Sequence, residues 1–114
     1  MELLKERIRR EGKVLPGNII KVDGFLNHRV DTKLLEALAD EFAKYFDISK
    51  ITMVLTAEAS GIALATICAQ KYGVPMLFAK KAKSDNIEGG LYQSEVFSYT
   101  YKKKVTLLVS QDWI

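Results

Sequence analysis

One carboxylate and a few small residues separate two apolar runs in the stretch VLTAEASGIALA, residues 54–65. The connecting residues are Glu58, Ala59, Ser60 and Gly61. Small side chains let the backbone approach a ligand, and the first turn of a helix presents unpaired N–H groups with partial positive charge. The stretch therefore indicates a phosphate-binding loop, although it is neither a P-loop nor a Gly-x-Gly-x-x-Gly fingerprint. A tight turn whose small residues serve only packing is the alternative, and spacing alone slightly favours it.

The acid in this stretch limits what the loop can do. The Glu58 carboxylate would repel a phosphate directly, because both groups are anionic. It could instead accept hydrogen bonds from sugar hydroxyls, from metal-bound water or from the N–H groups of the loop itself. The sequence leaves these three roles open.

A second candidate site follows the next apolar run, in FAKKAKS, residues 78–84. Its lysines are Lys80, Lys81 and Lys83, and three positive charges there would suit a diphosphate. A solvated basic loop is the alternative, since that is the usual place for lysines.

Two strands and a helix must position these residues. Residues 51–56 and 74–79 are mostly apolar and do not alternate, which predicts two strands, the second continuing to Lys80, that are buried on both faces. Residues 61–73 between them predict a helix that ends at Gly73. A strand–helix–strand unit over 51–80 crosses over right-handed and makes a parallel sheet, whose ligands bind beyond the carboxyl ends of the strands.

The flanking segments predict further elements. A helix is expected over residues 2–11, with Gly12 as its stop. Asp31 is a plausible N-cap for a second helix, whose apolar face holds Leu34, Leu35, Leu38, Phe42 and Tyr45. Residues 91–101 and 103–110 are expected to form an antiparallel hairpin or flap.

Composition sets the broad class. The chain has 114 residues, of which 48% are hydrophobic and 27% charged, as in one small globular domain. Its net charge of +3 allows an anionic small ligand but does not by itself indicate nucleic acid. One cysteine, Cys68, and one histidine, His28, exclude a disulfide framework and a His-cluster metal site, and both are expected to be structural. No apolar run reaches membrane-spanning length, so the cytoplasm is the expected location.

Four segments, taken in order, resemble the bacterial xanthine phosphoribosyltransferases, a branch of the type I purine phosphoribosyltransferases. They are KVDGFLNHRVD, LTAEASGIALA, GVPMLFAKKAKS and LYQSEVFSYT, and the likeness extends over essentially the whole chain. The resemblance implies an α/β fold with a parallel sheet, flanking helices and an antiparallel hood, incomplete at the carboxy terminus. It also implies purine salvage in the cytoplasm by a homodimer that needs Mg²⁺. The reaction would transfer 5-phosphoribose from phosphoribosyl pyrophosphate (PRPP) to xanthine, giving xanthosine 5′-monophosphate and pyrophosphate.

The same resemblance assigns roles to residues. The purine contacts of the family fall on Ile20 and Asn27, within a purine-recognition segment over residues 1–30. The core of the domain would be residues 31–83, and residues 84–110 would form a mobile hood that excludes water. The pyrophosphate and phosphoribosyl contacts fall on the loop and on the basic residues after the second strand, namely Glu58, Ala59, Ser60, Gly61, Lys80, Lys81 and Lys83.

One motif of the family is missing from these 114 residues. The family has an apolar strand that ends in paired aspartates and a small-residue loop, which hold the ribose hydroxyls and the 5′-phosphate, and no such motif occurs here. We therefore expect the chain to be the amino-terminal part of a phosphoribosyltransferase domain and to be inactive, or nearly so, alone. A non-catalytic regulatory module that binds purine or PRPP is the alternative function, and a fragment that associates with itself through exposed apolar surface is another.

Overall fold

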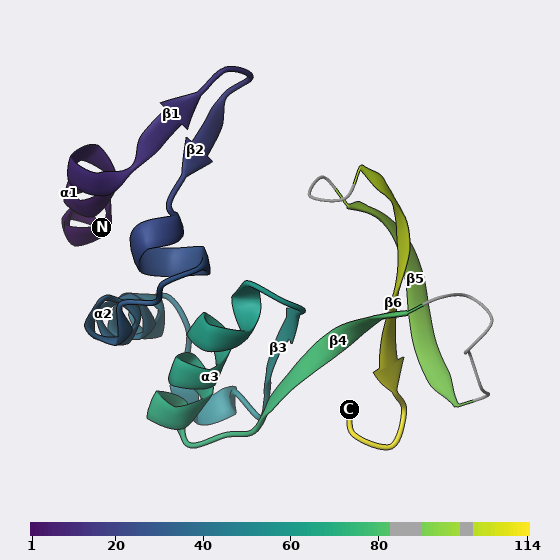
Figure 1. The fold of residues 1–114 in the computed structure, drawn as a ribbon. Helices are drawn as coiled ribbons and strands as arrows, with labels where there is room; N and C mark the ends of the chain where they lie inside the picture. The colour runs from purple at the N-terminus through teal and green to yellow at the C-terminus, as the bar shows by residue number, and fades with distance from the viewer. Residues whose placement is uncertain (83–89, 99–101) are drawn as a thin grey trace.

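The computed structural model describes residues 1–82, 90–98 and 102–114, and these form an α/β fold. Figure 1 shows the helices gathered on one side and a curled sheet that extends away from them. In chain order the elements are α1 (Glu2–Glu11), β1 (Lys13–Leu15), β2 (Ile19–Lys21), a π-helical turn (Asp23–Asn27), α2 (Thr32–Ala43), a 3₁₀ turn (Ile48–Lys50), β3 (Val54–Ala57), α3 (Gly61–Tyr72), β4 (Met76–Ala82), β5 (Leu91–Ser98) and β6 (Lys103–Ser110).

The strand–helix–strand unit predicted over residues 51–80 is confirmed. Strands β3 and β4 pair in parallel, with Val54 opposite Met76 and Ala57 opposite Ala79, and α3 connects them. Helix α3 ends at Gly73, whose φ of 71° lies in the left-handed region that favours glycine. Both strands are displaced from their predicted bounds, since β3 begins only at Val54 and β4 continues to Ala82.

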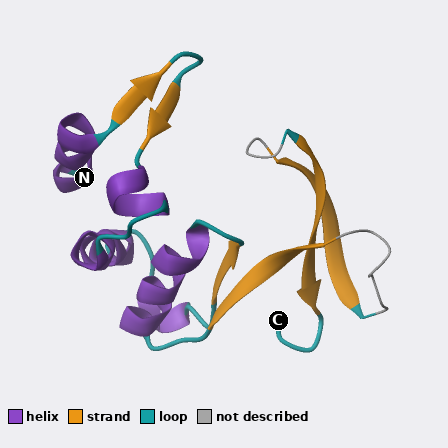
Figure 2. Cartoon of the chain, in the orientation of Figure 1, coloured by secondary structure: helices purple, strands orange, loops and turns teal. Residues whose placement is uncertain are grey.

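The predicted antiparallel hairpin is also confirmed. Strands β5 and β6 pair over their whole lengths, from Leu91 opposite Ser110 to Ser98 opposite Lys103. Strand β6 also pairs antiparallel with the last three residues of β4, so the sheet has the order β3-β4-β6-β5. Among the described strands, β4 joins the helical side to the hairpin (Figure 2). Part of the expected hood, residues 84–89 and 99–101, lies outside the described residues.

The amino-terminal half packs around one aromatic ring. Phe25, in the π-helical turn, is fully buried against Leu34, Leu35 and Leu38 of α2, and residues of α1 and α3 pack on this cluster. Helix α1 ends before Gly12 as predicted. The apolar face of α2 is shorter than predicted, because Phe42 is 38% exposed and Tyr45 lies beyond the helix end and is 73% exposed.

Helix α2 begins at Asp31 as predicted. The Asp31 carboxylate accepts hydrogen bonds from the backbone N–H groups of Lys33 and Leu34, and it also receives a hydrogen bond from Arg7 of α1 at 2.8 Å. The bond from Arg7 lowers the pKa of Asp31 below its ordinary value. This residue therefore ties α1 to the start of α2. No helix in the described residues is long and apolar enough to cross a membrane.

Candidate functional site

The loop of residues 58–60 lies at the carboxyl end of β3 and leads directly into α3. Parallel pairing holds both ends of the strand, since Val54 N–H donates to Pro75 O at 3.0 Å and Glu58 N–H donates to Ala79 O at 3.1 Å. The Glu58–Ala59 peptide bond is cis. The predicted loop is therefore placed where ligands bind in open parallel sheets.

The Glu58 carboxylate engages protein backbone. Its Oε1 atom accepts a hydrogen bond from the backbone N–H of Lys81 in β4. Of the three roles left open by the sequence, this contact resembles the third, although the N–H belongs to the neighbouring strand and not to the loop. The acid therefore ties the loop to the part of β4 that carries the lysines.

Gly61 has a packing reason to be glycine. A Cβ atom built there would collide with the Thr56 hydroxyl and lie 3.6 Å from Thr56 Cβ. The first residue of α3 can approach β3 this closely only without a side chain. The packing interpretation of the stretch therefore holds at residue 61, whereas Ala59 and Ser60 are exposed.

The start of α3 lacks a side-chain cap for its backbone N–H groups. Ser60 occupies the N-cap position but makes no capping hydrogen bond, whereas the Asp31 side chain caps α2 with two. Ile62 N–H donates to Ala59 O at 3.2 Å. Within the described residues no acceptor is assigned to the N–H groups of Ser60 and Gly61. An uncapped helix start with exposed small residues is suited to an anion.

Lys80 and Lys81 lie within β4. Lys80 is opposite Leu108 and Lys81 is opposite Leu107 of β6. Lys80 is exposed and Lys81 is half-buried. Because successive side chains of a strand point to opposite faces, the side chains of Lys80 and Lys81 lie on opposite faces of the sheet. Lys83 lies outside the described residues.

The two residues expected to contact a purine lie on separate elements. Ile20 is on β2 and is 53% exposed, and Asn27 ends the π-helical turn and is also exposed. Leu26, next to Asn27, packs on the same buried cluster as Ala63 from the first turn of α3. This shared cluster brings the π-helical turn and the beginning of α3 into one packed body. A direct contact between Asn27 and the loop stays a prediction.

The described residues offer little to a bare metal ion. No group of three or more His, Cys, Asp or Glu side chains there lies close enough to hold one. Glu58, the acid of the loop itself, already uses one oxygen for the Lys81 N–H. Mg²⁺ retains several waters and binds through substrate phosphates with few carboxylates. The residues present therefore fit a magnesium ion that arrives with a diphosphate, and do not fit a preformed metal site.

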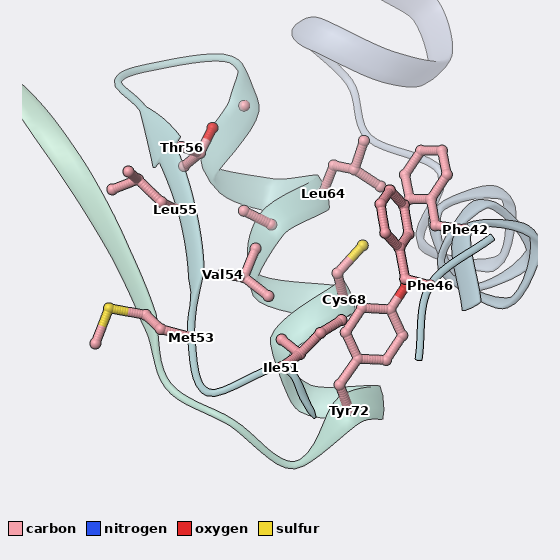
Figure 3. A pocket seen from close by; sticks show the side chains of 12 residues that line it. Phe42, Phe46, Ile51, Met53, Val54, Leu55, Thr56, Leu64, Cys68 and Tyr72 are labelled. Carbon is pink, nitrogen blue, oxygen red and sulfur yellow. The ribbon is translucent and has the colours of Figure 1, made fainter. Parts of the chain in front are cut away.

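An apolar groove beside the loop was not predicted. It has a volume of about 400 Å³ and lies between β3, α3 and the carboxyl end of α2 (Figure 3). Tyr72 lines it and donates a hydrogen bond to Ala39 O of α2 at 2.7 Å, and burial raises the pKa of Tyr72 to about 12. Burial likewise raises the pKa of the Cys68 thiol, so this cysteine is a poor nucleophile. Phe46 also lines the groove and is 63% exposed.

Curated relatives match the chain from end to end. It is 48% identical over 114 residues to the xanthine phosphoribosyltransferase of Lachnoclostridium phytofermentans, covering 100% of this chain and 59% of that protein. It is 52% identical over 110 residues to the xanthine phosphoribosyltransferase of Lactobacillus delbrueckii subsp. bulgaricus, and the match covers 96% of this chain and 57% of that protein. No family profile matches the sequence. The resemblance to xanthine phosphoribosyltransferases is confirmed, and the chain spans somewhat under two thirds of these relatives' length.

Solved structures show the same fold. The adenine phosphoribosyltransferase of Giardia lamblia, complexed with 9-deazaadenine, aligns over 94% of this chain and 59% of its own with a TM-score of 0.68 and 22% identity. The adenine phosphoribosyltransferase of Saccharomyces cerevisiae aligns over 100% of this chain and 66% of its own, with a TM-score of 0.67 and 15% identity. The expected phosphoribosyltransferase-type fold is therefore confirmed.

Proposed function

We propose that this chain, as a homologue of xanthine phosphoribosyltransferases, supplies the pyrophosphate-binding and purine-binding part of an enzyme that makes xanthosine 5′-monophosphate. The observation that carries the proposal is the uncapped start of α3, held against β4 by the contact between Glu58 and Lys81 N–H. The names of the relatives supply the reaction, and the loop supplies the place for the leaving group.

In this proposal the loop neutralises departing charge. The pyrophosphate of PRPP lies against the N–H groups of residues 59–61, and Lys80 and Lys81 add positive charge from β4. Such donors are fixed before the reaction, so they stabilise the developing charge without reorganising. Lys83 and the hood, residues 84–110, complete this side of the site. Mg²⁺ bound to PRPP would supply further charge neutralisation.

The purine side of the proposal rests on Asn27 and Ile20. The Asn27 amide offers both a donor and an acceptor to an oxo-purine, and Ile20 offers an apolar surface for the ring. The turn that ends in Asn27 belongs to the packed cluster that also holds the first turn of α3. A cytoplasmic location and a homodimer belong to the same proposal.

We further propose that a polypeptide of these 114 residues binds PRPP but turns it over poorly. It contains no paired-aspartate motif for the ribose hydroxyls and the 5′-phosphate. Holding both ends of a substrate contributes roughly 7–11 kcal/mol to catalysis in favourable cases. A binding module without catalysis is the second candidate function for the same reason.

A matched pair of variants tests the loop. Ser60 has φ −67°, which proline adopts, so Ser60→Pro removes one backbone N–H without straining φ at residue 60. Ser60→Ala removes the hydroxyl and keeps the N–H. Calorimetric titration with PRPP and Mg²⁺ should give similar affinities for the native chain and Ser60→Ala, and an affinity at least tenfold weaker for Ser60→Pro. Equal affinities for the two variants, or no binding by the native chain, would refute the proposed role of the loop.

A further inference from the structure

The side chain of Asn27 takes its direction from the turn that carries it. Within the described part of the chain, no hydrogen bond is assigned to the Asn27 amide. The residue closes the π-helical turn Asp23–Asn27 and is exposed. Turns of this kind are rare and occur frequently at functional sites. Whatever fixes the backbone of the turn therefore also fixes the direction of this amide.

Phe25 anchors the turn to the rest of the chain. Its ring is fully buried against leucines of α2. Its backbone oxygen accepts a hydrogen bond from Asp31 N–H, at 2.9 Å. Asn27 follows two residues later, so a shift of Phe25 within the core displaces the amide as well.

Arg7 of α1 acts on both groups of Phe25 that hold the turn. Its guanidinium carbon lies 5.1 Å from the centroid of the Phe25 ring, which is within the range of a cation–π contact. The same guanidinium donates a hydrogen bond to the Asp31 carboxylate at 2.8 Å. Glu11, one turn later on α1, forms an ion pair with Arg7 Nε. With only 15% of its side chain exposed, Arg7 is held in one orientation over the ring.

The connection between α1 and the turn gives no such support. The chain passes from α1 through the hairpin of β1 and β2 before it reaches the turn (Figure 1), and every residue of these two strands is exposed. Leu4 and Ile8 of α1 also pack on the cluster around Phe25. Apolar contacts of this kind are non-directional, whereas a planar guanidinium with three fixed partners sets an orientation.

We propose that Arg7 is a positioning residue for purine binding, which holds Phe25 so that the Asn27 amide faces the purine. The inference rests on the proposed purine role of Asn27. Arg7 acts through the turn and does not touch the purine, because its guanidinium is already engaged by Phe25, Asp31 and Glu11. A purely structural Arg7 is the alternative, and its loss would lower the free energy of unfolding without changing the purine affinity of the folded chain.

Equilibrium titrations of the 114-residue chain with xanthine test the proposal. Arg7→Met keeps much of the side-chain length and removes the charge and the donors, so it should weaken xanthine binding about tenfold. Binding of PRPP with Mg²⁺ should change less than about twofold, because the loop before α3 lies on other elements. Arg7→Lys keeps a cation and one donor for Asp31, so it should lose no more than about threefold. Arg9→Met, at a position whose side chain is 66% exposed on the same helix, should bind like the native chain.

A double-variant cycle separates positioning from general stability. Asn27→Ala should weaken xanthine binding about tenfold, and adding Arg7→Met to it should weaken binding less than about twofold further, because Arg7 acts through Asn27. Circular dichroism checks that each variant folds. If Arg7→Met does not fold, Asp31→Asn replaces it in the cycle, since it keeps a capping oxygen for α2 and removes the charge that Arg7 pairs with.

The possible failures are distinguishable. If Asn27→Ala weakens xanthine binding but Arg7→Met does not, or if Arg7→Met weakens it equally with and without Asn27, the inference about Arg7 is overturned and the purine role of Asn27 stands. If the native chain does not bind xanthine, or Asn27→Ala binds it as tightly as the native chain does, the purine role of Asn27 is refuted and the inference with it.

Discussion

Replacing Gly61 with alanine tests the close approach of α3 to β3. The added Cβ would collide with the Thr56 hydroxyl, while its distance of 3.6 Å from Thr56 Cβ is ordinary contact, so the clash involves one atom. Overpacking of this kind costs about 1–3 kcal/mol. Alanine favours a helix over glycine by up to about 1 kcal/mol, which offsets part of that cost. The free energy of unfolding should therefore fall by about 0–3 kcal/mol.

The partner of the clash supplies the sharper measurement. Thr56→Ala removes the hydroxyl, so the double variant Thr56→Ala/Gly61→Ala should be more stable than the sum of the single variants predicts, by about 1–3 kcal/mol. Urea unfolding of the four proteins measures this coupling. Gly24→Ala is the matched control, since a Cβ there meets nothing within 4 Å, and it should not lower stability. A Gly61→Ala variant more stable than the native chain, with no coupling to Thr56, would refute the close approach.

Three further perturbations follow from individual contacts. Glu58→Ala should lower the free energy of unfolding by about 1 kcal/mol and weaken PRPP binding, because Lys81 N–H loses its acceptor. Glu58→Gln keeps an oxygen at that position, so its effects on unfolding and on PRPP affinity should be smaller. If urea unfolding and PRPP titration give equal effects for the two variants, the contact is contradicted. Phe25→Ala should lower the free energy of unfolding, measured in urea, by about 3–5 kcal/mol, because the ring is fully buried. The control Leu3→Ala, at a 52% exposed position, should change it by no more than about 0.5 kcal/mol. A small effect at Phe25 would contradict its burial in the core. The pKa of Tyr72 is raised from 10.0 to about 12 in the fold, so its contribution to stability is complete below pH 10 and is lost as pH rises through about 12. Between pH 10 and 12, Tm of the native chain should therefore fall more steeply than Tm of the Tyr72→Phe variant. Parallel curves of Tm against pH would contradict the burial of the Tyr72 hydroxyl.

Local patterns predicted α1, α2, α3 and the strands of the four-stranded sheet, but not β1, β2 or the π-helical turn. Uniform apolar runs on both sides of a helix identified β3, α3 and β4, and the segment of residues 103–110 matches β6 at both ends. The errors have tertiary causes. Residues 51–53 are as apolar as β3 but have no partner, because the pairing of β4 begins at Met76. Strand β4 extends beyond its apolar segment because Lys80, Lys81 and Ala82 pair with β6, which begins more than 20 residues later in the sequence.

The candidate site was predictable in position but not in its internal contacts. Small residues between a strand and a helix indicated the loop, and the order of elements placed it at the carboxyl end of β3. The hydrogen bond from Lys81 N–H to Glu58 depends on where β4 passes, which the spacing of 23 residues does not reveal. The need for glycine at residue 61 likewise comes from Thr56 across the loop. The groove was missed because it is formed by three elements, none of which has a distinctive pattern alone.

The central claim is that the start of α3 holds the pyrophosphate end of PRPP. An NMR titration of the ¹⁵N-labelled 114-residue chain with PRPP and Mg²⁺ tests it most directly, by following each backbone amide. The largest changes in amide chemical shift should occur at Ser60, Gly61 and Lys81 and should saturate at the same PRPP concentration. The amides at the capped start of α2 should keep their chemical shifts. Saturable shifts elsewhere, with the amides of residues 59–61 unchanged, would contradict it.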